Sequence, residues 1–196
     1  MVLKLNLVKS FDRVNWTYLR LILLQIGIPL MGMNWIMGSI SSANFALLIN
    51  GSPLGFFTSS KGIRKGFPLS PLLFILVIEG LSLFLKDAKG GGKIKGIQIS
   101  ASLSLTHLLF VDDVVLFGLG TLVEWMAFEV LLENLCVASG MYISVDKSRF
   151  IFNELEEGVL NSIRLFLPYN VDPIHMGFKY LGYFIKPLGY GVKDWL

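Results

Sequence analysis

Two adjacent carboxylates, Asp112 and Asp113, lie in the middle of a strongly apolar stretch. The residues on both sides, 108–111 and 114–117, are all hydrophobic. Burying two neighbouring charges in an apolar ribbon is very costly without compensation, so we expect them at a hairpin tip or facing cations. Hard divalent cations take oxygen ligands, and two such ions can clamp the attacking and leaving oxygens of a phosphoryl transfer. The pair therefore indicates either a divalent metal site or an ordinary Asp-rich turn.

The segments around this pair alternate between strand and helix patterns. Residues 2–8 alternate apolar with polar side chains, which is the period of a half-buried strand, and a helical pattern opened by Asp12 ends at Gly27 and Pro29. A hairpin is expected over 45–59, with its turn at 51–53. Strands and helices mix without regular βαβ alternation, which predicts an α+β fold: a small antiparallel sheet with helices packed on one face. Further helices are expected at 31–41, 70–88, 122–138 and 154–167, and further strands at 94–99, 142–152 and 179–185, while the carboxylate pair lies within the stretch 105–117.

The composition fits one substantial domain but is unusually apolar. Of the 196 residues 54% are hydrophobic and only 16% are charged, against a usual charged content of about a quarter. This excess suggests either a membrane protein or part of a larger protein. The two most apolar windows, 19–33 and 69–85, fall short of the ~20 residues that span a bilayer. We therefore expect buried helices there, no transmembrane segment, and no secretory signal peptide.

Charge and cysteine content exclude little by themselves. A net charge of +3 is too small to diagnose nucleic-acid binding. Basic residues gather at 61–65 and 86–95, where solvated loops and helix ends are the favoured interpretation. The single cysteine, Cys136, excludes an intrachain disulfide and a cysteine zinc cluster; we expect it in the core. His107 is expected to be structural.

Five segments resemble the motifs of reverse transcriptases. Phe110 to Asp113, within 108–117, resembles the aromatic-x-Asp-Asp signature, motif C. That pair alone is weak, but five motifs in the family's order are a strong signal. The sequences of these segments most resemble those of plant LINE-type non-LTR retrotransposons. The other four resemblances are motif A at 3–16 (LKLNLVKSFDRVNW), motif B at 62–76 (GIRKGFPLSPLLFIL), motif D at 139–148 (SGMYISVDKS) and the primer grip at 179–185 (KYLGYFI).

This resemblance implies the palm of an RNA-directed DNA polymerase, a nucleotidyltransferase. Its partners would be an RNA template, a DNA primer and dNTP, and its cofactors two Mg²⁺ (or Mn²⁺) ions in an intact relative. The primer 3′-hydroxyl would attack the α-phosphate, with the ions held by Asp112, Asp113 and the residue at position 6. The family implies a nuclear or cytoplasmic protein. We expect one palm-like domain over 1–196, with the fingers missing and the thumb absent or incomplete.

The resemblance also implies roles for individual residues. Phe11 matches the aromatic residue that lies under the incoming sugar, and Lys147 matches the lysine proposed to protonate the departing pyrophosphate. In motif B, Gly62 and Gly66 would let the backbone approach template and nucleotide closely. The remaining assignments are nucleotide binding for Gly66, Pro68 and Ser70, and primer binding for Tyr180, Leu181 and Gly182.

Three positions depart from the family pattern. Asn6 stands where the family has the catalytic Asp of motif A, Lys65 where it usually has Gln, and Phe67 where it usually has Asp. An amide keeps one oxygen but loses the charge, and losing one member of a catalytic set can cost on the order of 10⁴ in rate. Asp12 is expected to cap a helix instead of replacing it. We therefore expect a degenerate, impaired polymerase. The alternatives are a non-catalytic retroelement remnant that binds nucleic acid weakly and, further off, a small membrane protein.

Overall fold

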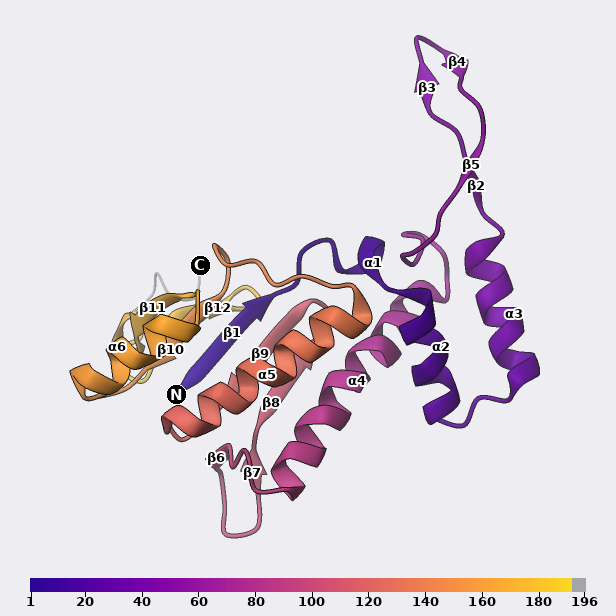
Figure 1. The fold of residues 1–196 in the computed structure, drawn as a ribbon. Coiled ribbons are helices and arrows are strands. Elements are labelled where there is room, and N and C mark those ends of the chain that lie inside the picture. Colours follow the sequence, from indigo (N-terminus) through magenta and orange to yellow (C-terminus); the bar gives the residue numbers. More distant parts are fainter. Residues whose placement is uncertain (192–196) are drawn as a thin grey trace. The chain divides into compact units, whose positions relative to one another are not determined.

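The computed structural model describes residues 1–191, and the largest sheet in that part is built around β1 (Val2–Asn6). β1 pairs antiparallel with β9 (Asp113–Phe117) on one side and with β10 (Arg149–Phe152) on the other. β8 (His107–Phe110) extends the sheet beyond β9, and β11 (Asn170–Pro173) extends it beyond β10 (Figure 1). All neighbours are antiparallel except β10 and β11, which are parallel.

The described residues form two compact units. Unit 1 contains Met1–Asn6, Leu85–Leu131 and the chain from Ile143 onward, and therefore holds the whole five-stranded sheet. Unit 2 contains Leu7–Phe84 and Leu132–Tyr142. The helices α4 (Ser70–Gly90) and α5 (Leu122–Ser139) each have residues in both units. The expectation of a single domain over 1–196 stays a prediction, because residues 192–196 lie outside the described part.

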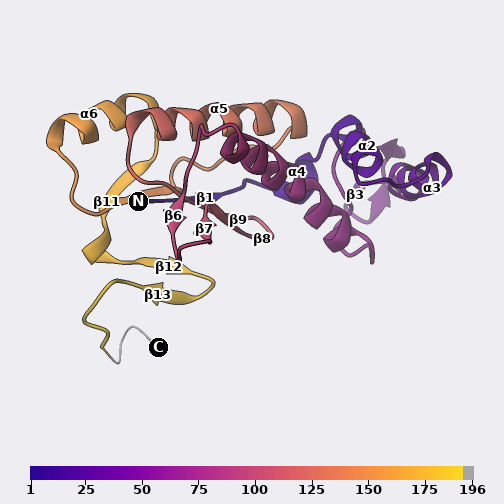
Figure 2. The ribbon, with the colours of Figure 1, turned by 90° about the horizontal axis from the view of Figure 1, so that it is seen from below.

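Both faces of the unit 1 sheet are covered. Helix α5 places Trp125 and Phe128 in the core, where the Trp125 ring meets Phe150 of β10 edge-on at 4.8 Å. Leu3 and Leu5 of β1 are fully buried. Helix α6 (Glu157–Phe166) lies on the same face as α5, and the hairpin of β12 (Phe178–Tyr180) and β13 (Tyr183–Ile185) lies on the other (Figure 2). That second face is sealed by Val2, Val115 and Ile151, which contact Phe117, Ile174, Phe178 and Tyr180.

A buried carboxylate, Glu124, binds two main-chain segments of unit 1 to the start of α5. Its Oε1 accepts hydrogen bonds from the amides of Lys95 (2.7 Å) and Gly96 (3.0 Å), and its Oε2 accepts one from Leu119 (2.6 Å). Glu124 is only 4% exposed. The bonds connect α5 to the segment after β9 and to the segment leading into β6 (Ile97–Gln98), which pairs with β7 (Ser104–Leu105). The 3-10 helix at Ile174–Met176 follows β11.

Unit 2 is mainly helical. It contains α1 (Ser10–Arg13), α2 (Trp16–Gln25), α3 (Leu30–Ser41) and the first part of α4. The Tyr18 hydroxyl of α2 donates to the carbonyl of Val77 in α4 (3.3 Å), and Gly80 leaves the room that the Tyr18 ring occupies. An extended arm follows α3, made of β2 (Asn44–Phe45) paired with β5 (Phe57–Thr58) and β3 (Leu48–Ile49) paired with β4 (Ser52–Pro53).

The α+β class, the antiparallel sheet and the helices on one face are as the sequence predicts, but several boundaries are wrong. Asn15, not Asp12, caps α2: its Oδ1 accepts from the amides of Thr17 (2.7 Å) and Tyr18 (3.3 Å). The arm turns at Asn50–Gly51, where both residues have positive φ, instead of at 51–53. Asn-Gly satisfies a two-residue turn whose twist matches its strands, so it outcompetes the proline-containing alternative.

Three strand predictions also need correction. The stretch predicted as one strand at 179–185 is the hairpin β12–β13, and only Arg149–Phe152 of the stretch 142–152 is a strand. The strand predicted at 94–99 is limited to Ile97–Gln98. β11 was not predicted at all. Cys136, expected in the core, is half-buried.

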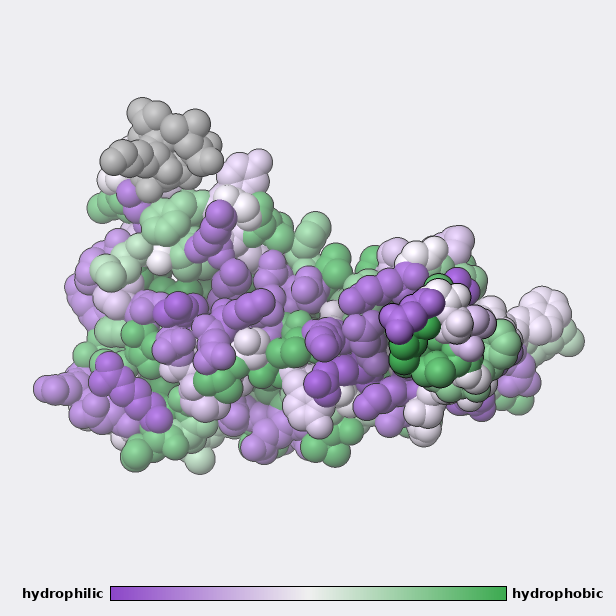
Figure 3. Space-filling view, turned by 90° about the horizontal axis from the view of Figure 1, so that it is seen from above, coloured by the Kyte–Doolittle hydropathy of each residue, from purple (hydrophilic) through white to green (hydrophobic). Residues whose placement is uncertain are grey.

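Apolar side chains reach the surface as well as the core. Among residues 1–191, no helix is both long enough and apolar enough to cross a membrane. On the face drawn in Figure 3, green apolar residues lie among the purple hydrophilic ones. The arm after α3 contributes strongly to the exposed apolar area of the described residues. Its exposed apolar side chains include Leu47, Leu48, Ile49, Leu54, Phe56 and Phe57.

The three hydrogen bonds that the Glu124 carboxylate accepts can be tested by their effect on stability. Glu124→Ala leaves three main-chain N–H groups without their acceptor, and each unsatisfied buried donor costs about 1–3 kcal/mol. We expect the free energy of unfolding, measured by urea denaturation, to fall by about 3 kcal/mol or more. Glu133→Ala, an exposed change on the same helix, should stay within about 0.5 kcal/mol of the parent. Equal effects of the two substitutions would contradict the stabilising role of the Glu124 hydrogen bonds.

Candidate functional site

The two carboxylates lie at the end of the β8–β9 hairpin. Phe110 pairs with Asp113, so Val111 and Asp112 form a two-residue turn. Val111 has φ of 52°, in the left-handed region that β-branched residues rarely adopt. Such a conformation costs about 1–3 kcal/mol and persists only where the surroundings impose it. Asp112 and Asp113 are both half-buried. The hairpin tip expected from the apolar flanks is therefore present, with a strained turn beside the carboxylates.

Asn6 is the direct cross-strand neighbour of Asp113. It is the last residue of β1, and the register pairs Asn6 with Asp113. Residues directly opposite each other in an antiparallel pair project to the same face, about 4.5–5.5 Å apart at Cβ. The position where the family has its third acid is thus beside the aspartates, but it carries an amide.

The segment that carries Lys147 is fastened to the main chain of Asn6. The amide of Asn6 donates to Ser148 Oγ (3.2 Å), and the carbonyl of Asn6 accepts from the amide of Ser144 (2.9 Å). Lys147 lies between these two serines, and its side chain is exposed. Unit 1 therefore holds the lysine of motif D on a loop that ends beside the carboxylate pair.

The predicted primer-grip residues form the turn of the β12–β13 hairpin. Leu181 (φ 49°) and Gly182 (φ 88°) are both in the left-handed region, as a tight two-residue hairpin turn requires. Burial raises the pKa of the Tyr180 phenol, and the negative charge of Asp113 raises it further. The effect of Asp113 on this pKa indicates that the Tyr180 phenol lies close to that carboxylate. Lys4 Nζ holds the hairpin against the sheet by donating to the Lys179 carbonyl (2.7 Å).

Unit 2 brings the predicted nucleotide-binding residues together. Phe11, Gly66, Pro68 and Ser70 all line one cavity of about 460 Å³. The Phe11 ring stacks on Phe74 of α4, with ring centres 4.5 Å apart and planes 17° apart. Ser70 is buried, and its hydroxyl donates to the carbonyl of Arg64 (2.6 Å). The Ser70 hydroxyl therefore stabilises the motif B loop, while Phe74 supports the Phe11 ring.

Motif B packs against motif A through the main chain. The amide of Gly62 donates to the Val14 carbonyl (2.8 Å), and that of Ile63 donates to the Phe11 carbonyl (2.7 Å). Gly62 has φ of +86°, and a Cβ there would lie 2.7 Å from the Asp12 carbonyl oxygen. Glycine at 62 is thus required by its close approach to the main chain of Asp12. Gly66 (φ +82°) has open space around it.

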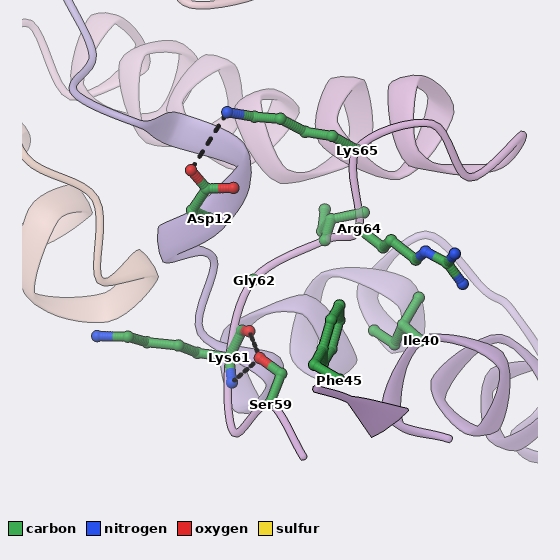
Figure 4. Close-up of a pocket in the computed structure, with 9 residues that line it drawn as sticks. Asp12, Ile40, Phe45, Ser59, Lys61, Gly62, Arg64 and Lys65 are labelled. Atoms are coloured by element: carbon green, nitrogen blue, oxygen red, sulfur yellow. Dashed lines mark hydrogen bonds and ion pairs between the residues drawn. The ribbon is translucent and has the colours of Figure 1, made fainter. Parts of the chain in front are cut away.

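Two residues singled out in the sequence pair with each other. Lys65 Nζ lies 3.2 Å from Asp12 Oδ2, at the edge of a cavity of about 340 Å³ (Figure 4). The side chains are 66% and 48% exposed, so solvent screens the pair and it adds little stability. It does give Lys65 and Asp12 a local partner. The sequence alone could not predict this ion pair, because the two residues are 53 positions apart. Phe67 lines the Phe11 cavity.

The oxygen donors at the hairpin tip are two carboxylates and one amide. Within residues 1–191, no group of three or more His, Cys, Asp or Glu side chains could hold a metal ion. An amide oxygen can ligate a divalent cation, but it supplies no negative charge to bring two cations together. The donor set therefore does not fit the two-ion centre expected in an intact relative.

The chain resembles known proteins along almost its whole length. The family description "Reverse transcriptase (RNA-dependent DNA polymerase)" matches residues 1–185. A retrovirus-related Pol polyprotein from the type-1 retrotransposable element R2 of Popillia japonica is 28% identical over all of this chain. An uncharacterised mitochondrial protein of Arabidopsis thaliana is 49% identical over 34% of it. The chain spans only 28% of the first relative and its match covers 55% of the second.

Solved structures agree on the fold. Apo telomerase of Candida tropicalis, truncated from its C-terminal domain, matches with a TM-score of 0.57 at 16% identity, over 75% of this chain and 29% of the other. Telomerase of the same organism in complex with a fragment of telomeric RNA matches with a TM-score of 0.56 at 13% identity, over 75% and 25%. Together with the family match over residues 1–185, the order of the five motifs makes this chain a member of the reverse transcriptase (RNA-dependent DNA polymerase) family.

Proposed function

We propose that the chain is the palm of a LINE-type, plant-like retroelement polymerase that binds a template and primer but synthesises DNA poorly or not at all by itself. The observation that carries the proposal is the register of β1 with β9, because it puts Asn6 and not an acid opposite Asp113. The likeness to the R2 polyprotein supports the retroelement assignment, and the likeness to a protein of Arabidopsis thaliana supports the plant-like one.

The proposed roles follow the geometry of each unit. In unit 1, Asp112 and Asp113 are the remaining acids, Lys147 is the candidate proton donor to pyrophosphate, and the Tyr180–Leu181–Gly182 turn holds the primer end. In unit 2, the stacked Phe11 ring offers a flat apolar floor for the sugar of the nucleotide, with Gly66 and Pro68 beside it. An RNA template is supported by the family and by the telomerase neighbour bound to an RNA fragment.

Reverse transcriptases depend on divalent metal ions, and Mg²⁺ or Mn²⁺ is the expected cofactor of intact relatives. The two acids and one amide found here suit at most weak binding of such an ion. The alternative function, a non-catalytic remnant that binds nucleic acid weakly, needs no metal. Its binding should weaken steeply with salt and be indifferent to Mg²⁺.

Primer extension separates these functions. On an RNA template with a DNA primer, we expect the chain to extend the primer no better than the Asp112→Ala variant, because a catalytic set missing one acid loses on the order of 10⁴ in rate. Template-dependent, Mg²⁺-dependent extension clearly above that control would overturn the proposal of impairment.

The Asn6→Asp substitution tests the carboxylate site without requiring activity. Like charges directly opposite in a strand pair are destabilising by roughly 0.2–1 kcal/mol, so without metal this variant should unfold more easily than the parent. Millimolar Mg²⁺ should restore it, since a ligand that binds only the folded state stabilises by mass action. Thermal unfolding with EDTA or Mg²⁺ measures both effects.

Asn153→Asp adds the same charge at an exposed loop position and serves as the matched control. Its unfolding temperature should respond to Mg²⁺ no more than the parent's does. If Asn6→Asp and Asn153→Asp respond alike, position 6 is not part of a cation site.

The Tyr180 phenol reports whether the primer-grip turn lies beside Asp113. Its pKa is raised above the ordinary value of 10.0 by burial and by Asp113, so Asp113→Asn should lower it while leaving it above that value. NMR of ring-labelled tyrosine across alkaline pH measures this, with Tyr180→Phe to assign the signal. Tyr18, whose pKa burial alone raises to about 12, should not move.

The same shift has a consequence for stability. Because the folded-state pKa of Tyr180 lies above its unfolded value, the neutral phenol favours the folded state. Its contribution is complete below the ordinary value of 10.0 and is lost as pH rises through the folded-state pKa. An Asp113→Asn variant with an unchanged Tyr180 titration would show that the turn does not face the carboxylate.

A further inference from the structure

Unit 2 contains a second cavity that the proposed polymerase roles leave unused. It encloses about 730 Å³ and shares no residue with the cavity that Phe11 lines. Its walls come from α2 and the residues just before it, from Ser60 and Lys61, and from Gly140 and Tyr142. Three of the residues are cations, Arg13, Arg20 and Lys61, and within the described chain no lining residue is acidic.

The charges of these cations are not neutralised within residues 1–191. The side chains of Arg13, Arg20 and Lys61 form no ion pair there, and Arg13 Nε is buried without a hydrogen-bond partner. The Arg13 guanidinium instead stacks over the Tyr142 ring, 4.3 Å from its centre. A stacked guanidinium is held in one plane, which is how arginine presents its forked donors to phosphate oxygens.

The three segments are tied to one another by main-chain hydrogen bonds. Asn15 donates to the carbonyl of Ser139 (2.7 Å), and Val8 donates to that of Tyr142 (2.8 Å). Trp16 Nε1 donates to the carbonyl of Gly62 (2.7 Å), which fixes the indole beside the Ser60–Lys61 wall. Gly140 has φ of +73°, and a Cβ there would lie 2.9 Å from the Arg13 carbonyl oxygen. The cations are therefore carried on a framework formed before any ligand arrives.

The smaller cavity of Figure 4 does not explain where the Lys61 side chain points. Although Lys61 lines both cavities, its side chain in Figure 4 extends away from Phe45 and Ile40 and away from Arg64. Asp12, which pairs with Lys65, lines the smaller cavity and does not line this one. The acid nearest in sequence to Arg13 is thus already engaged elsewhere.

We propose that this cavity is a binding site for a run of two or more phosphates. The cavity is lined by three cations that form no ion pair within residues 1–191, by the hydroxyl-bearing Thr17 and Ser60, and by two aromatic residues. This lining matches a phosphate chain with attached bases or sugars. The phosphates belong either to a single-stranded nucleic-acid backbone or to a free polyphosphate. The site does not depend on the carboxylates of unit 1, so it holds whether or not the chain synthesises DNA.

The test compares the full chain with the double variant Arg20→Gln/Lys61→Gln. Both side chains are exposed, so the fold should be kept, which circular dichroism and thermal unfolding check. Lys93→Gln/Arg164→Gln removes the same charge from exposed positions of unit 1 and is the matched control. Binding of a fluorescent single-stranded RNA is measured across a salt series, and binding of tripolyphosphate is measured by calorimetry.

We expect the pocket variant to lose affinity on the order of tenfold, since charge-assisted contacts to phosphate are lost. Its salt slope on RNA should fall by about 0.7 per cation removed, while the control keeps the parent's affinity. Loss confined to RNA identifies a nucleic-acid backbone as the ligand, and loss confined to tripolyphosphate identifies a free polyphosphate. If the pocket and control variants behave alike on both probes, or the parent binds neither, the site does not exist.

Discussion

The pairing of β1 with β9 is the constraint on which the candidate site depends. Side chains alternate between the faces of a strand, so one register sends Leu3 and Leu5 beneath α5 and sends Asn6 to the face of Asp113. A slip by one residue would expose the leucines and bury Asn6, which makes the register strongly specified. The hydrophobic core therefore positions the polar site. The strained turn at Val111 is the conformational cost of ending that ribbon in two carboxylates.

The amide at position 6 changes the balance between stability and chemistry at this site. A third carboxylate opposite Asp113 would add like-charge repulsion in the absence of cations, and it would be tolerated only because bound ions compensate for it. Asn6 removes that repulsion together with the charge that attracts metal. A change of this kind gains stability at the expense of function, which is the trade-off expected where activity needs a destabilised site.

The sequence predicted what is decided locally. The Asp112–Asp113 hairpin and the long helices α4 and α5 follow from periodicity, and motif order groups Phe11 with the residues that share its cavity. What it missed depends on distant partners. β11 (NVDP) has no apolar alternation and includes a proline, and it becomes a strand only because β10 lies alongside it.

The same reason explains the misplaced polar residues. Nothing in the sequence marks Glu124 as an acceptor of main-chain hydrogen bonds, because two of its three donors, the amides of Lys95 and Gly96, are 29 and 28 positions away. Asp12 and Asn15 are both good capping residues by type, so the sequence could not choose between them. The cavity of Arg13, Arg20 and Lys61 is the strongest case. Its cations come from segments separated by up to 48 positions between Arg13 and Lys61, and a net charge of +3 gives no sign that they line one cavity.

Catalysis by this family requires negative charge to gather cations, whereas nucleic-acid binding requires positive charge to gather phosphates. Under the proposed function, the amide of Asn6 weakens the first requirement and, because it carries no negative charge, does not weaken the second. The proposal therefore allows nucleic-acid binding to persist where catalysis is lost.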